Sequence, residues 1–165
     1  MKTKAHKSSF WLIVILLMTV PLTAACERQI SRNDDGSLTV ETSITQEELQ
    51  SAIQEAIADP LITEMSVTLQ TGDILVNGQR QWLNDPSKSD TLTFRLNLGV
   101  SAGHLTASVS DAQIDGVPVD QERVTHWNET IANHLENIAN RRPNAVLQSV
   151  SVTSEAATMT WQVTK

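Results

Sequence analysis

The sequence predicts an α+β domain in which an antiparallel sheet packs on two helices. Two segments carry apolar residues at the 3.6-residue spacing of a helix. The segments between and after them alternate apolar and polar residues with a period of two, and no parallel βαβ pattern occurs. The predicted order of elements is therefore β-α-β-β-β-β-α-β-β.

The predicted domain begins with a short strand at Ser37 to Thr42, which is followed directly by the first helix. Thr45 can cap this helix, and Glu48, three residues later, can complete a capping box. Asp59-Pro60 ends the helix. One face of it is apolar, with Leu49, Ala52, Ile53, Ala56 and Ile57.

The strands after the first helix each have one apolar and one polar face. Thr71-Gly72-Asp73 is the preferred hairpin turn, Asn77-Gly78 is a second turn or a bulge, and Asn84 to Asp90 is a loop. The alternating apolar positions are Met65, Val67 and Leu69, then Leu92, Phe94, Leu96, Leu98 and Val100, then Leu105, Ala107 and Val109.

The second helix is predicted to start after Pro118, with Asp120 as its cap, and to end at Arg141-Arg142-Pro143. Its apolar stripe consists of Val124, Trp127, Ile131, Leu135 and Ile138. A final hairpin follows, in which Val146 to Val152 and Ala157 to Val163 are joined by a turn at Ser154 to Ala156.

Residues 1–25 are typical of a secretory signal. This segment has three lysines and no acid, followed by an apolar run from Phe10 to Val20 and by small residues. The run is shorter than the roughly 20 residues that span a bilayer. Extending it through Ala25 leaves an uncleaved signal anchor as the alternative. The residues Leu22-Thr23-Ala24-Ala25-Cys26 resemble the lipobox of bacterial lipoproteins, although Thr23 stands where that family most often has leucine.

This resemblance implies that Cys26 becomes the lipid attachment site and that the signal is cut before it. The protein would then be attached to the cell membrane by lipid, on the extracytoplasmic face or on the periplasmic side of a two-membrane envelope. Residues 26–36 are predicted to be the lipidated cysteine and a polar tether. Residues 37–165 are predicted to be a single α+β domain.

The charge and the cysteine count exclude several classes of protein. Three of the 12 basic residues and none of the 19 acidic residues lie in 1–25. Residues 26–165 therefore carry nine basic and 19 acidic side chains, a net charge of −10. This balance argues against binding nucleic acid, and one cysteine excludes an intramolecular disulfide or a multi-cysteine metal site.

No motif predicts catalysis, a cofactor or a metal site, and the protein is not expected to be an enzyme. Gly99 to Gly103 matches the G-x-S-x-G pattern of a hydrolase, but Ser101 falls between two predicted strands, where a hairpin turn is expected. His126 and His134 are eight residues apart, too far for a zinc pair on one helix turn, and are expected on the helix surface. Core packing is the preferred interpretation of Trp82, Trp127 and Trp161.

From Leu38 to Val163, the order of elements and the turn Gly116-Val117-Pro118 resemble single-module bacterial relatives of the tubular lipid-binding (TULIP-like) proteins. The resemblance implies that an antiparallel curved sheet wraps the long helix and leaves an apolar groove for acyl chains. The residues lining it would be Leu92, Phe94, Leu96 and Leu98 from the sheet and Val124, Trp127, Ile131 and Leu135 from the helix.

Two non-enzymatic functions follow as hypotheses. The first is a lipoprotein domain that binds an acyl chain or another apolar ligand in the seam between the helix and the sheet. The second is an envelope protein-interaction or structural module whose core is filled and whose sheet face or edge strand recruits another protein. A closed, fully packed core together with an exposed apolar patch of several hundred Å² would favour the second function.

Overall fold

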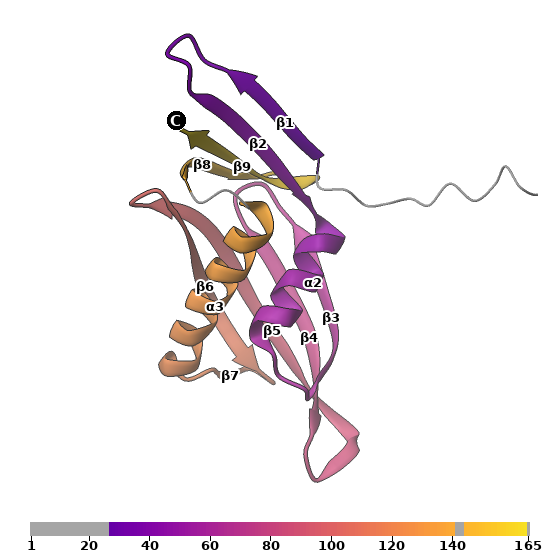
Figure 1. Cartoon of the computed structure of the whole chain (residues 1–165). Helices are drawn as coiled ribbons and strands as arrows, with labels where there is room; N and C mark the ends of the chain where they lie inside the picture. Colours follow the sequence, from indigo (N-terminus) through magenta and orange to yellow (C-terminus); the bar gives the residue numbers. More distant parts are fainter. Residues whose placement is uncertain (1–26, 141–143, 165) are drawn as a thin grey trace, which may run out of the picture.

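The computed structural model describes residues 27–140 and 144–164, which form an α+β fold with two antiparallel sheets and two helices (Figure 1). The sequence predicts one sheet, whereas the described strands form two. Sheet A has the strand order β1-β2-β9-β8, and sheet B has the order β3-β4-β5-β6-β7. The strands are β1 (Glu27–Arg32), β2 (Leu38–Thr45), β3 (Ile62–Leu69), β4 (Ile74–Trp82), β5 (Asp85–Ser101), β6 (His104–Ile114), β7 (Val117–Pro118), β8 (Ala145–Val152) and β9 (Ala156–Val163).

Strand β1 occupies the segment that the sequence predicts to be a tether, so that prediction is wrong. Glu27 to Arg32 pair antiparallel with β2, and Asn33 to Gly36 form the turn. The segment lacks an apolar alternation because β1 is an edge strand whose described side chains are exposed, and backbone pairing holds it. In the turn, hydrogen bonds from the side chain and then the backbone of Ser37 lower the pKa of Asp35.

Sheet B confirms the hairpin turn at Thr71 to Asp73, where the Gln70 N–H donates to the Asp73 carbonyl at 3.0 Å. Gly78 is not in a turn. It lies inside β4, where an added Cβ would stand 3.1 Å from the Glu64 carbonyl oxygen, so a side chain there would require β3 to shift by a few tenths of an ångström. The predicted loop at 84–90 is mostly the start of β5, which extends the β4–β5 hairpin.

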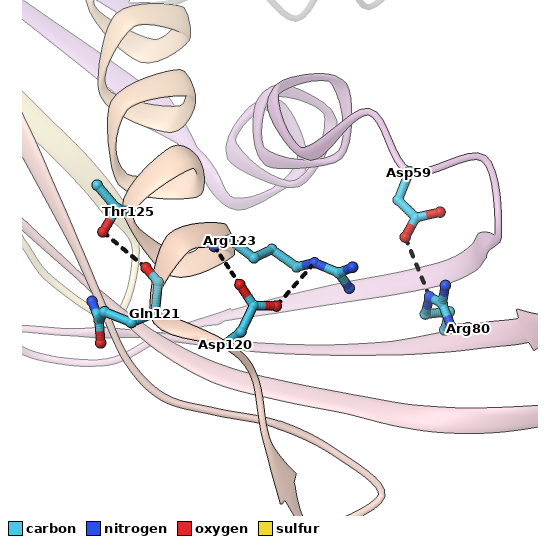
Figure 2. A network of polar contacts seen from close by, with 6 residues as sticks. All are labelled: Asp59, Arg80, Asp120, Gln121, Arg123 and Thr125. Carbon is cyan, nitrogen blue, oxygen red and sulfur yellow. Dashed lines mark hydrogen bonds and ion pairs between the residues drawn. The ribbon is translucent and has the colours of Figure 1, made fainter.

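Both predicted helices are confirmed. Helix α2 (Gln46–Ile57) begins with the capping box of Thr45 and Glu48 and ends at Ala58, which has a φ of 50°. Helix α3 (Gln121–Ala139) begins at Asp120, whose carboxylate accepts from the Arg123 N–H at 2.8 Å (Figure 2). The predicted stop at 141–143 lies outside the described residues.

The helices pack against sheet B, and sheet A closes one end of that layer (Figure 1). Two backbone hydrogen bonds join the sheets through β8. Gly72 N donates to Val152 O at 3.0 Å, and Leu147 N donates to Gly103 O at 2.8 Å. One hydrophobic core cluster includes residues of both sheets and both helices, from Val40 to Trp161.

Candidate functional site

The helix–sheet seam contains the eight residues predicted to line an apolar groove. Phe94 of β5 and Trp127 of α3 meet at its centre, with ring centroids 5.7 Å apart. Leu98 is half-buried at the edge of this cluster. The other seven side chains are at most 8% exposed, namely Leu92, Phe94, Leu96, Val124, Trp127, Ile131 and Leu135.

These seam residues pack on one another and on the rest of the core. The surface hollows found in the described part of the chain are lined by other residues. The most enclosed of them lies beside Val40, Ala139 and Trp161 and has a volume of about 10 Å³, enough for one water molecule. The seam is therefore filled by its own side chains.

The motifs considered for catalysis and metal binding lie in ordinary structural positions. Ser101 ends β5, and Ala102 and Gly103, with φ of 51° and 82°, form the hairpin turn that the sequence predicts. His134 Nε2 lies 3.1 Å from the Glu55 carboxylate of the neighbouring helix, whereas His126 is exposed. Within residues 27–140 and 144–164, no group of three or more histidine, cysteine or acidic side chains could hold a metal ion.

The free edge of β6 is closed by side chains of α3. The carboxylate of Glu136 accepts from the Leu105 N–H at 2.8 Å and contacts His104 Nδ1 at 2.9 Å. About two helical turns before Glu136, the Asn128 side-chain oxygen accepts from the Val109 N–H at 2.7 Å. Because these N–H groups point away from β5, the helix takes the place that a further strand would occupy.

Strand β3, at the other edge of sheet B, is open along its middle. The Gln70–Asp73 pair is hydrogen-bonded, and hydrogen-bonded and non-hydrogen-bonded residue pairs alternate along two antiparallel strands. The N–H and C=O groups of Leu69, Val67 and Met65 therefore point away from β4. Gln46 accepts from the Leu69 N–H at 3.4 Å, which confirms this direction. Among the described residues, no side chain accepts from the N–H groups of Met65 and Val67.

The side chains of β3 suit an exposed strand on one face and a core strand on the other. Met65 and Val67 are buried, at 7% and 2% exposure. Glu64, Ser66 and Thr68 are exposed on the opposite face. We call the N–H and C=O groups of Met65 and Val67, with the exposed Ser66 between them, the open edge.

A second exposed feature is the distal tip, which we define as residues 81–89 of the β4–β5 hairpin. Trp82 is 45% exposed and Leu83 is 78% exposed, so the interpretation of Trp82 as a core residue is wrong. The indole N–H of Trp82 donates to the Asp90 carboxylate at 2.5 Å, and Lys88 Nζ lies 5.2 Å from the ring centre. Trp127 and Trp161 are core residues as predicted, at 4% and 1% exposure.

The tip is braced by its own polar residues. The Ser87 hydroxyl donates to Asp85 at 2.6 Å, and the Lys88 ammonium lies 3.3 Å from the same carboxylate. These two contacts, the Ser87 hydrogen bond first, lower the pKa of Asp85. At the base of the hairpin, Arg80 pairs with Asp59, which follows α2, at 3.3 Å (Figure 2).

An open hollow of about 510 Å³ lies where the hairpin base meets the start of α3. Asp115 belongs to its lining, and the Asp115 carboxylate accepts from the Thr91 N–H at 2.6 Å. Apolar and acidic side chains share the lining, which comprises Asp90, Ile114, Asp115, Val117, Pro118, Val119, Asp120 and Arg123. The hollow is therefore a mixed polar and apolar surface. Its acidic residues do not form a group that could hold a metal ion.

None of the protein families, curated proteins and solved structures compared with this chain matches it. No helix within the described residues is long and apolar enough to cross a membrane. Cys26, the predicted lipid attachment site, lies outside the described residues.

The sequence analysis missed two of the surface features. The open edge gives no signal of its own, because it depends on which strand has no neighbour. The distal tip did give a signal, since Trp82-Leu83 stands next to a polar, turn-rich segment rather than inside an alternating run.

Proposed function

We propose that this protein is a membrane-tethered extracytoplasmic lipoprotein whose domain is a non-enzymatic interaction module. Its open edge takes up an extended segment of another envelope protein as an added strand. The observation that carries the proposal is the difference between the outer sides of β3 and β6. Side chains of α3 close the part of β6 that β7 does not pair with, whereas β3 keeps free backbone groups at Met65 and Val67.

The filled seam supports this function over the binding of an apolar ligand. Ile131 and Leu135 are fully buried, and Phe94 and Trp127 occupy the position that a ligand would take. An acyl chain would have to displace these side chains, at a cost comparable to removing them from the core. A partner that pairs with β3 displaces nothing.

The backbone groups of the open edge fit an extended partner. Met65 and Val67 each offer one N–H and one C=O, and each new hydrogen bond contributes about 0.5–1.5 kcal/mol. Strand β1 also lacks an outer neighbour, but it begins one residue after Cys26. In the anchored protein, β1 is thus held next to the lipid. The other edge of sheet A, β8, is bonded to the turns of sheet B at Leu147 and Val152. We therefore take β3 as the edge with which a partner pairs.

Site-specific photo-crosslinking in cells tests the open edge against a matched position. A photoreactive residue replaces Ser66 on β3 or Ser108 on β6. Both are exposed serines, and Ser108 lies in the part of β6 that β7 does not pair with. We expect a discrete adduct of higher mass at position 66 that the added change Thr68→Lys abolishes, since charge on an edge blocks pairing. The same adduct at position 108, or none at position 66, contradicts the proposal.

Two further measurements test the tether and the alternative ligand. Metabolic labelling with an alkyne fatty acid should label the wild-type chain and leave Cys26→Ala unlabelled and released from the membrane fraction. Native mass spectrometry of residues 27–165 should show the bare polypeptide mass. A bound and exchangeable lipid would instead establish the ligand-binding function.

A further inference from the structure

The distal tip projects from the far end of sheet B, away from sheet A (Figure 1). It presents two adjacent large apolar side chains, Trp82 and Leu83, of which more than two fifths and more than three quarters are exposed. Exposed tryptophan and leucine side by side at a hairpin end leave apolar surface in water, which costs free energy unless another phase covers it.

The Trp82 ring is held in place and its polar atom is satisfied. Its N–H donates to Asp90, and Lys88 stands over one face of the ring. A ring with its donor already bonded can leave water without losing a hydrogen bond. An indole with a cationic neighbour also suits the boundary between polar headgroups and acyl chains.

The charge of the hairpin differs from that of the domain. From Arg80 to Asp90 there are two basic and two acidic residues, so this segment is neutral, whereas residues 26–165 carry −10. Arg80 pairs with Asp59 and Lys88 with Asp85, whereas the Asp90 carboxylate accepts a hydrogen bond from the neutral Trp82 N–H. The tip therefore brings two ion pairs and one hydrogen-bonded carboxylate to a lipid surface, and an uncharged surface does not repel that carboxylate as an anionic one would.

The size of the apolar tip decides which partner it fits. Two partly exposed side chains amount to a few hundred Å² at most, below the roughly 800 Å² that each partner buries in a stable protein interface. An open hollow of about 340 Å³ beside the tip does not include Trp82 or Leu83, so the apolar side chains do not line a groove; its lining is Thr63, Glu64, Gln79, Gln81, Pro86, Ser87, Lys88 and Ser89. A bilayer deforms around such a tip and requires no complementary shape.

From these observations we propose that the distal tip is a lipid-contact site, which places Trp82 and Leu83 in the headgroup and upper acyl region of an uncharged bilayer. The tip is a second membrane attachment, separate from Cys26 and from the open edge. Strand β4 spans nine residues, about 30 Å, between the turn that touches sheet A and the tip. Attachment to the membrane both at the Cys26 anchor and at the distal tip would hold the long axis of β4 along the membrane.

Tryptophan fluorescence of the soluble segment 27–165 tests this site, because Trp82 is the exposed one of its three tryptophans. The probe is vesicles of phosphatidylcholine, with and without bromine on the acyl chains, at millimolar lipid. We expect vesicles to shift the tryptophan emission to the blue and brominated chains to quench it strongly. Trp82→Phe, with its own emission in the absence of lipid subtracted, should show neither change. Unchanged emission at the highest lipid concentration overturns the proposal.

Vesicle flotation separates the tip from general stickiness. Leu83→Ala should lower the partition coefficient about tenfold, since most of an exposed leucine side chain is lost to the lipid phase. Val100→Ala, a truncation of another exposed apolar residue at the opposite end of β5, should leave it unchanged. Equal losses in both variants would contradict a specific tip. Failure of the crosslinking at Ser66 would leave these results untouched.

Discussion

Trp127→Ala distinguishes a filled seam from a ligand groove. Trp127 is 4% exposed, packs in the core and lies 5.7 Å from the Phe94 ring centre. Truncating such a residue costs about 3–5 kcal/mol, of which the aromatic pair contributes about 1 kcal/mol. Since a domain of this size is stable by about 5–15 kcal/mol, a large part of the free energy of unfolding should disappear.

The assay is urea unfolding of residues 27–165 followed by far-UV circular dichroism. Trp82→Ala is the matched control, since it removes the same side chain from the exposed tip and should cost about 1 kcal/mol or less. If Trp127→Ala does not fold, Trp127→Leu, which fills most of the space, should still lose about 2 kcal/mol.

Two results would refute the reasoning. If Trp127→Ala and Trp82→Ala destabilised the domain equally, by less than about 1 kcal/mol, the Trp127 ring would have to face an open groove rather than packed atoms. A wild-type domain that gains stability with added fatty acid, in proportion to the logarithm of its concentration, would likewise show an existing ligand site.

Three further predictions concern the edges and turns. Glu136→Ala should speed hydrogen exchange of the Leu105 amide and cost about 1–2 kcal/mol, whereas Glu136→Gln, which keeps an acceptor, should restore most of the protection; an unchanged amide would mean that α3 does not close β6. Gly103→Ala should destabilise more than Gly72→Ala, by about 2 against about 1 kcal/mol in urea unfolding, because both glycines have positive φ but only at Gly103 would the new Cβ meet Val146, at 2.6 Å; equal losses would place the cost in the backbone alone. Ser87→Ala should raise the pKa of Asp85 toward its ordinary value in an NMR carboxyl titration. A carboxyl group whose pKa is lower in the folded state stabilises the fold above its unfolded-state pKa, and this stability is lost as the pH falls through its folded-state pKa. The variant should therefore differ in stability from the wild type at neutral pH and not in strong acid.

The sequence predicts local structure well where residues close together in the sequence determine it. Thr45 and Glu48 form the expected capping box, and Asp120 caps α3 as its position before an amphipathic run requires. The turn at Gly72 is where glycine follows an alternating strand. These features depend on neighbours within four residues, so pattern and propensity suffice to find them.

The division into two sheets and the strand β1 could not be predicted in this way. Ile30 is 54% exposed, and the side chains of β1 do not show the apolar alternation that predicts a strand, because β1 pairs with β2 through backbone atoms alone. At the boundary between the two sheets, the turns at Gly72 and Gly103 of sheet B are hydrogen-bonded to β8 of sheet A. Each of these two bonds joins residues at least 44 positions apart in the sequence. Single-residue patterns do not encode such contacts.

The openness of β3 shows why a candidate site of this kind escapes sequence analysis. Ser66 and Ser108 occupy equivalent exposed positions on strands with the same alternation. What distinguishes their edges is the position of α3, whose Glu136 and Asn128 reach β6, while α2 offers β3 one glutamine, Gln46, at its end. The helix residues that close an edge are polar and are read locally as a solvated face. Removing such a helix side chain should therefore open β6: Asn128→Ala should speed hydrogen exchange of the Val109 amide, and an unchanged exchange rate would mean that the helix does not protect this part of the strand.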